Sequence, residues 1–210
     1  MSPLYPLFLD INGKPCLIVG GGAVAFRKAM ALLKCGAKVS VVAPELTEKM
    51  KELVDSKKIT YIPGFFKPEH MEGVTLAFGC TDMPEVNRAV YVVAVARGVL
   101  VNIVDQPKLC SFMVPAVVRR GDLSLAISTS GKSPAVAKKA RKSLEKEFGE
   151  EWAVYLDMMG KARETVLKTI DDQARRETIF NNLTDSDLLD KIKNGDMAGA
   201  KRLVEEITEA

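Results

Sequence analysis

The sequence predicts an α/β fold, in which a parallel β-sheet carries helices on both faces and is followed by a small strand-and-helix region and a helical C-terminal region. Three observations predict it. Short apolar runs alternate with segments of helical spacing through the first half of the chain. Two longer apolar runs then flank the turn sequence Arg119-Arg120-Gly121-Asp122. From Glu150 onward the spacing is helical only.

The first half has the order of repeated β–α–β units, which form parallel sheets covered by helices. Glycine and proline separate its elements: Gly36 ends the first helix, Pro44 ends the second strand, and Pro63-Gly64 ends the third. The expected strands are Cys16–Val19, Lys38–Ala43, Ile59–Ile62, Val74–Gly79 and Leu100–Val104, and the expected helices are Ala23–Cys35, Glu45–Ser56 and Pro84–Arg97.

The second half begins with an expected hairpin and continues with helices. A helix should start at Pro134, because Ser133 suits the N-cap and proline suits the first helical position. The chain therefore divides into three expected parts, 1–111, 112–149 and 150–210. The expected hairpin strands are Phe112–Val118 and Leu123–Thr129, the helix runs to about Phe148, later breaks fall near Thr169–Asp172 and Asn181–Thr184, and an acidic helix covers Asn194–Ala210.

Composition and charge exclude several classes of protein. The net charge of +3 does not by itself suggest a nucleic-acid partner, and no apolar run approaches the roughly 20 residues that span a bilayer. The opening MSPLYPLFLD has no basic segment, so we expect no signal peptide and a cytoplasmic protein. We expect no metal site and no disulfide. The four cysteines, Cys16, Cys35, Cys80 and Cys110, lack Cys-x-x-Cys spacing. His70 is expected to be exposed to solvent and not to bind a metal.

A glycine turn at Gly20–Ala25 follows the first expected strand and fits G-x-G-x-x-A. Gly20 would permit a tight turn, Gly22 would let a pyrophosphate approach the backbone, and Ala25 would let helix and strand pack closely. The backbone N–H groups at the start of the helix, on Ala23, Val24 and Ala25, would face the phosphates. A packing corner is the alternative, but the position at the first β–α junction favours dinucleotide binding in a Rossmann-type domain.

The end of the second strand lacks the acidic residue that usually binds the ribose hydroxyls. Pro44 and Glu45 follow the strand directly, and either the Glu45 carboxylate or their backbone groups could serve. No arginine takes this place, so NAD is expected rather than NADP.

A polar loop with basic neighbours lies before the helix at Pro134. It resembles a P-loop at first sight, but Ala126 stands where that motif requires glycine. Basic residues dominate from Val114 to Lys142, where Asp122 is the one acidic residue. The pattern fits either a solvated helix face or a site for a polyanionic small molecule. The expected substrate-binding residues are Ser128, Thr129, Ser130, Gly131, Lys132 and Ser133.

Two stretches together, LIVGGGAVAFRKA and NIVDQPKLCSFMVPAVVRRGDLSLAISTSGKSPAVAKKAR, closely resemble the siroheme synthase N-terminal family. The resemblance implies an NAD-dependent precorrin-2 dehydrogenase with a Rossmann domain, a dimerisation region exchanged between subunits and a helical C-terminal domain. It also implies a homodimer acting on a tetrapyrrole, and some members insert ferrous iron into sirohydrochlorin. Phe26 departs from the family, since many relatives carry an acidic residue there.

The resemblance also assigns roles to residues at the expected strand ends. Asp105 follows the fifth strand, at the edge where such sheets bind ligands, and is the expected catalytic base; a turn aspartate before Pro107 is the alternative. Thr81, Asp82 and Asn102 are expected near the nicotinamide or the substrate. Asn87 is expected to cap or brace a helix instead.

Three other functions compete with this interpretation. A short-chain dehydrogenase needs Tyr-x-x-x-Lys, which no tyrosine here provides. A non-catalytic NAD-binding regulatory module would explain Gly20–Ala25 but neither Asp105 nor the basic second half. A purely structural dimerisation protein would leave both anion-binding loops without a purpose.

Overall fold

The structure is a computed structural model in which residues 4–209 are described. The chain divides into two compact units, with the boundary between Val114 and Pro115. The α/β class with a parallel sheet and a helical C-terminal region is confirmed. The finer division into 1–111, 112–149 and 150–210 stays a prediction.

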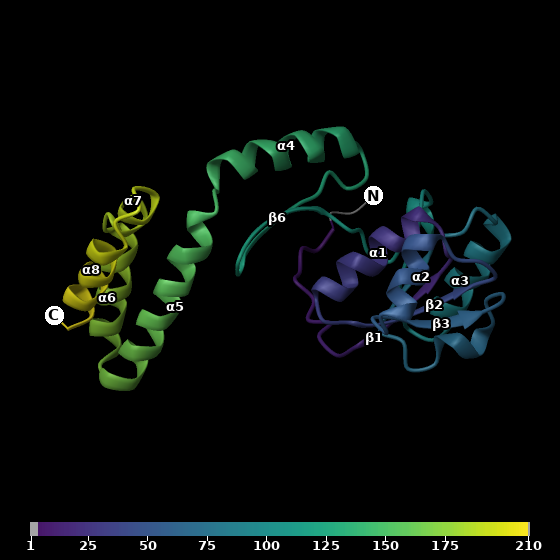
Figure 1. Ribbon diagram of the computed structural model, residues 1–210, viewed down its shortest axis with the longest axis horizontal. Helices are drawn as coiled ribbons and strands as arrows, with labels where there is room; N and C mark the ends of the chain where they lie inside the picture. Colours follow the sequence, from purple (N-terminus) through teal and green to yellow (C-terminus); the bar gives the residue numbers. More distant parts are fainter. Residues whose placement is uncertain (1–3, 210) are drawn as a thin grey trace. The chain divides into compact units, whose positions relative to one another are not determined.

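The first unit is built on a five-stranded parallel sheet with the strand order β3-β2-β1-β4-β5. Figure 1 labels β1, β2 and β3 of this sheet. The chain runs outward from β1 through β2 to β3, returns to the other side of β1 for β4, and ends at β5. The elements are β1 Pro15–Val19, α1 Ala23–Lys34, β2 Lys38–Ala43, α2 Glu48–Asp55, β3 Thr60–Pro63, η1 Pro68–Met71, β4 Leu76–Gly79, α3 Pro84–Ala96, β5 Leu100–Ile103 and η2 Pro107–Leu109.

The two faces of the sheet carry separate apolar cores. Successive side chains of a strand point to opposite faces, so Cys16 and Ile18 of β1 belong to the core under α1 and α2, while Leu17 and Val19 belong to the core under α3. A strand that is buried on both sides reads as a continuous apolar run, which explains why the sequence predicts these strands well.

The start of α2 differs from the prediction by three residues. The helix begins at Glu48 rather than Glu45, because Thr47 is its N-cap and donates its backbone N–H to the carbonyl of Gly21 at 3.0 Å. Pro44, Glu45 and Leu46 therefore form a loop that packs on the glycine turn. This loop becomes one wall of the site described next.

The second unit contains the antiparallel hairpin of β6 Ala116–Arg120 and β7 Leu123–Ile127, followed by helices. The strand β6 begins at Ala116 and not at Phe112, because the Phe112 carbonyl accepts a hydrogen bond from Asn102 at 3.0 Å. The predicted N-cap is confirmed, since the Ser133 hydroxyl accepts from the N–H of Val136 at 3.3 Å. The helices are α4 Pro134–Glu147, α5 Glu151–Thr169, α6 Gln173–Asp185, α7 Leu188–Lys193 and α8 Met197–Glu209.

The predicted break at Asn181–Thr184 is wrong, because α6 continues through it to Asp185. Ile179 and Leu183, four residues apart, are both buried on one side of the helix. The break comes instead at Ser186, whose hydroxyl donates to the Leu183 carbonyl at 2.7 Å.

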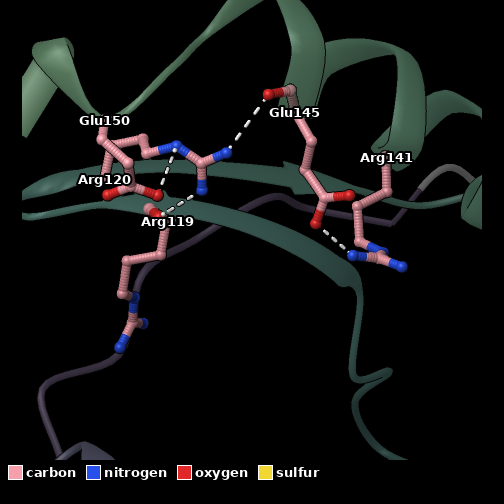
Figure 2. A network of polar contacts seen from close by, with 5 residues as sticks. All are labelled: Arg119, Arg120, Arg141, Glu145 and Glu150. Carbon is pink, nitrogen blue, oxygen red and sulfur yellow. Dashed lines mark hydrogen bonds and ion pairs between the residues drawn. The ribbon is translucent and has the colours of Figure 1, made fainter.

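Arg120 joins the hairpin to the helices of the second unit (Figure 2). Its guanidinium donates to the carbonyl of Glu145 at 3.2 Å, and its Nε lies 3.3 Å from a carboxylate oxygen of Glu150. Arg141 in turn pairs with the Glu145 side chain. The end of β6 is thereby tied to the junction between α4 and α5.

Within the described residues, no helix has the length and apolar character required to cross a bilayer.

Candidate functional site

A pocket of about 420 Å³ lies at the carboxyl edge of the parallel sheet. It opens where β1 and β4 lie side by side, and the chain leaves these two strands in opposite directions along the sheet, the position at which open α/β sheets bind ligands. Three segments supply most of its wall: the glycine turn after β1, the loop after β2, and the turn after β4. Its lining residues are Val19, Gly20, Gly21, Gly22, Val42, Pro44, Glu45, Gly64, Phe65, Phe66, Cys80, Thr81, Asp82, Met83 and Val86.

The glycine turn leaves the start of α1 open to an anion. Gly20 has φ of 123°, and a β-carbon on it would lie 2.6 Å from the Cys80 carbonyl oxygen, so only glycine fits there. Gly22 is the N-cap of α1 and offers no side-chain cap, and no acidic residue stands in the first turn. The N–H groups of Ala23, Val24 and Ala25 are those that a helix start leaves without intrahelical partners. The fit to a pyrophosphate is therefore good.

A second contact orients this turn, and the sequence did not predict it. Thr47 donates both its N–H, at 3.0 Å, and its hydroxyl, at 3.2 Å, to the carbonyl oxygen of Gly21. In a planar trans peptide the carbonyl and the following N–H point in opposite directions. The N–H of Gly22 is thus directed away from Thr47. The run of three successive glycines, Gly20 to Gly22, was the sequence signal that Gly21 also has a structural role.

The predicted residues after β2 and β4 line the pocket. These are Pro44, Glu45, Thr81 and Asp82. The Tyr61 hydroxyl donates to the Ala43 carbonyl at 3.0 Å and holds the end of β2 in place. Asn87 was predicted to cap or brace a helix. It lies within α3, and its side-chain amide donates to the Thr81 carbonyl at 2.8 Å, which braces the turn after β4.

Asn102 does not line this pocket. It lies in the middle of β5, is only 8% exposed, and donates its side-chain amide to the Phe112 carbonyl at 3.0 Å. Its observed contacts are therefore with the chain that follows β5. Whether it also approaches a ligand stays a prediction.

Several residues that line the pocket were not predicted from the sequence, because they belong to no polar motif. Phe65 and Phe66 follow β3 and Gly64, and Phe65 is 62% exposed although it is aromatic. Cys80 directly follows β4, and burial raises the pKa of its thiol to about 11, so that the thiol is uncharged at neutral pH. Together with Met83 and Val86 they give the pocket apolar walls around the glycine turn.

Asp105 lies at the same sheet edge, two residues after β5. The N–H of Val104 donates to the Gly79 carbonyl at 3.0 Å, which ties this segment to the end of β4. The side chain of Asp105 is exposed and its φ is 59°, a left-handed conformation that is uncommon for residues other than glycine. Such conformations gather at functional sites, so the geometry is consistent with the predicted role.

The predicted substrate loop belongs to the second unit and is held by its own hydrogen bonds. The Thr129 hydroxyl accepts from the N–H of Ser133 at 3.2 Å and donates to the Ser133 carbonyl at 3.1 Å. The N–H of Ser130 donates to the Ser128 hydroxyl at 3.1 Å, and Ser130 has φ of 52°. The loop at 128–133 is thus a compact turn with Lys132 exposed on it.

No group of three or more metal-binding side chains occurs in the described part of the chain. Cys16, Cys35, Cys80 and Cys110, all within the described residues, form no disulfide. The expectation that His70 is exposed is wrong: it is half-buried, its Nδ1 accepts from the N–H of Lys67 at 3.2 Å, and its ring lies edge-on to Phe66. The reason is the short helix η1, which folds the histidine back on the residue before Pro68.

Comparisons with known proteins agree with an NAD(P)-binding fold. A family described as putative NAD(P)-binding matches residues 7–116, and one described as sirohaem biosynthesis protein, central, matches residues 120–147. The siroheme synthase of Photobacterium profundum is 34% identical over 205 residues, which cover 98% of this chain and 44% of the relative. The siroheme synthase of Chromobacterium violaceum is 35% identical over 201 residues, which cover 96% and 43%. The chain thus spans less than half the length of these relatives.

A solved structure, SirC, precorrin-2 dehydrogenase, superposes with a TM-score of 0.83 at 24% identity, covering 99% of this chain and all of the other. At this identity the superposition establishes a shared fold.

Proposed function

The chain belongs to the siroheme synthase N-terminal family, and we propose that it is an NAD-dependent dehydrogenase that oxidises precorrin-2 to sirohydrochlorin. The observation that carries the proposal is the open start of α1 beside the glycine turn, on the same sheet edge as Asp105. An anionic dinucleotide and a base for proton removal are the two requirements of this reaction.

The cofactor is expected to lie along the pocket. Gly20, Gly22 and the N–H groups of Ala23, Val24 and Ala25 would hold the pyrophosphate. Pro44 and Glu45 would hold the ribose near β2, and the Glu45 carboxylate would repel a 2′-phosphate, which favours NAD over NADP. Bound NAD supplies the hydride acceptor of the reaction.

Asp105 is the proposed base in this reaction. Oxidation removes a hydride, two electrons with one proton, and a further proton from the macrocycle. The carboxylate of Asp105 would take that further proton. Its exposure and the absence of an ion pair to it within the described residues leave both oxygens accessible.

The loop Ser128–Ser133 is proposed to bind carboxylates of the tetrapyrrole. Its hydroxyl groups, the left-handed turn at Ser130 and Gly131, and the cation of Lys132 suit an anion. We also propose that the chain forms a homodimer, because apolar side chains of the second unit, Val117 on β6 and Val136 on α4, are exposed.

The test is an assay of purified protein with precorrin-2 and NAD, followed by the absorbance of NADH and of sirohydrochlorin. Both products should form together. If the protein binds NAD but leaves precorrin-2 unchanged, a non-catalytic NAD-binding regulatory module is the better description.

A second reaction, insertion of ferrous iron into sirohydrochlorin, stays a prediction. Iron would be a substrate here, so the lack of a described metal cluster does not bear on it. The observation in its favour is Asp105, whose exposed carboxylate could accept the pyrrole protons that iron displaces. Adding ferrous ion and sirohydrochlorin with and without the protein tests it through the rate of siroheme formation.

A further inference from the structure

Lys28 of α1 carries a positive charge into a partly apolar place beside the candidate site. Its side chain is half-buried, and its Nζ lies 5.4 Å from the centre of the Phe78 ring. Phe78 packs edge-to-face on Phe112, with 5.5 Å between ring centres. The neighbouring Arg27 on the same helix is exposed and thus provides a natural comparison.

Within residues 4–209, no carboxylate forms an ion pair with the charge of Lys28. Burial lowers the pKa of Lys28, and the groups that oppose this most are the thiols of Cys80 and Cys110. Burial raises the pKa of both thiols, so they are uncharged at neutral pH and cannot neutralise a cation.

The position of Lys28 relates it both to the cofactor pocket and to the loop that carries Asp105. Cys80 lines the cofactor pocket. Cys110 donates its thiol to the carbonyls of Ile103 and Gln106, on either side of Asp105 in the sequence, at 3.3 and 3.4 Å. Lys28 lies over the ring of Phe78, which precedes Cys80 by two residues on the β4 side of the sheet. Phe78 packs on Phe112, whose carbonyl accepts a hydrogen bond from Asn102 of β5. Lys28 is therefore beside the strands that lead to Cys80 and to Asp105.

Among the described residues, the Phe78 ring is the printed partner of this cation and no carboxylate pairs with it. An aromatic ring compensates a partly desolvated charge less than an anion does, and buried charges in proteins are usually paired. The missing partner is then an anion that arrives with a ligand. We propose that the ammonium group of Lys28 binds a carboxylate of the tetrapyrrole substrate and holds the macrocycle beside Asp105. This rests on the proposed function, because it assigns the anion to that substrate and not to the cofactor.

The experiment compares Lys28→Met with Arg27→Met in the full chain, using sirohydrochlorin, the stable oxidised product, as the binding probe. Methionine keeps the length and apolar stem of lysine but removes the charge. Loss of a charged hydrogen bond should weaken sirohydrochlorin binding about 10-fold or more, while the NAD dissociation constant stays unchanged. The melting temperature should stay equal or rise, since a desolvated charge is gone. Arg27→Met should bind sirohydrochlorin within about 2-fold of the wild type.

Lys28→Arg adds the complementary test, because it keeps the charge and should retain most of the affinity. Methyl-esterified sirohydrochlorin should bind wild type and Lys28→Met equally. Unchanged sirohydrochlorin binding by Lys28→Met overturns the inference, as does a loss of NAD affinity in its place, which would assign Lys28 to the cofactor. A wild-type protein that does not bind sirohydrochlorin at all contradicts the proposed function itself.

Discussion

Gly21 and Glu45 approach so closely that a β-carbon on Gly21 would lie 2.0 Å from the carbonyl oxygen of Glu45. The glycine turn and the loop after β2 are therefore packed backbone against backbone. The two hydrogen bonds from Thr47 to the Gly21 carbonyl fasten the same contact. Gly21 thus shapes the pocket through packing, whereas Gly22, where a β-carbon would meet nothing within 4 Å, leaves space for a ligand.

The first prediction concerns Gly21→Ala. The added methyl group cannot be accommodated by rotating a side chain, because its nearest neighbour is backbone. We expect the unfolding free energy to fall by about 2 kcal/mol or more, together with NAD affinity. Urea unfolding and NAD titration measure the two effects. Gly160→Ala, in α5 and without a neighbour in reach, should be neutral or stabilising and is the control.

Gly22→Asp should separate binding from folding. Gly22 has φ of −84°, which any residue adopts, and its side chain would point into open space, so stability should change little. A carboxylate at this position would oppose the pyrophosphate and cap the start of α1. NAD affinity should fall at least about 10-fold. A calorimetric titration that gives the wild-type dissociation constant would show that the pyrophosphate does not lie here.

Those pocket residues that belong to a local sequence motif could be predicted. The G-x-G-x-x-A hexapeptide, placed between a strand and a helix, gave Gly20 and Gly22, and the strand ends gave Glu45 and Thr81. Thr47 and Gly21 could not be paired from the sequence, since their contact joins positions 26 apart. Phe65 likewise carries no signal of its own, because its place in the wall depends on the register of β3 against β2.

The helical second unit shows the opposite error. Asn181, Asn182 and Thr184 look like a loop because such polar residues favour caps and turns. In the fold, Ile179 and Leu183 bury a stripe that continues the helix through them. Tertiary packing therefore outweighed local propensity, which is worth only tenths of a kcal/mol per residue.

Cys80 gives a prediction for pH. Its thiol has its pKa raised from 9.0 to about 11 in the folded state because of burial. The folded state then holds this proton more tightly than the unfolded state, so the stabilisation is complete below pH 9 and is lost as pH rises toward 11. Over this range Cys80 should contribute a loss of up to about 2–3 kcal/mol in unfolding free energy. Urea unfolding at pH 8 to 11 should show a shallower decline for Cys80→Ala than for the wild type; equal slopes would contradict the burial of this thiol.

The proposed homodimer rests on the second unit. Its sheet has only two strands, Val117 on β6 is 37% exposed, and Val136 on α4 is 57% exposed. Light scattering should report a dimer at micromolar concentration. Val117→Asp should shift it toward monomer, because a charge on an apolar interface strand is desolvated without a partner. Val92→Asp, on the exposed side of α3, should leave the mass unchanged. A monodisperse wild-type monomer rules the dimer out.

Asp105 is the residue on which the proposed chemistry depends. Its backbone conformation allows the substitution Asp105→Asn without strain. Its φ of 59° suits aspartate and asparagine better than most other residues. Asp105→Asn should therefore fold as the wild type does, with the same melting temperature. NAD binding should persist as well, because the proposed pyrophosphate site lies at the junction of β1 and α1, while Asp105 follows β5.

The last prediction is that Asp105→Asn binds both ligands but does not turn over. Asparagine keeps the shape of the side chain and cannot accept a proton, so precorrin-2 oxidation should slow by about 100-fold or more. Sirohydrochlorin affinity should hold or increase, since one negative charge facing a polycarboxylate is gone. Asp55→Asn, an exposed aspartate at the end of α2, should react at the wild-type rate and controls for net charge. A structural aspartate would behave differently, lowering the melting temperature and weakening both ligands together. If Asp105→Asn forms NADH from precorrin-2 at a near-normal rate, the base is another group and the catalytic assignment fails.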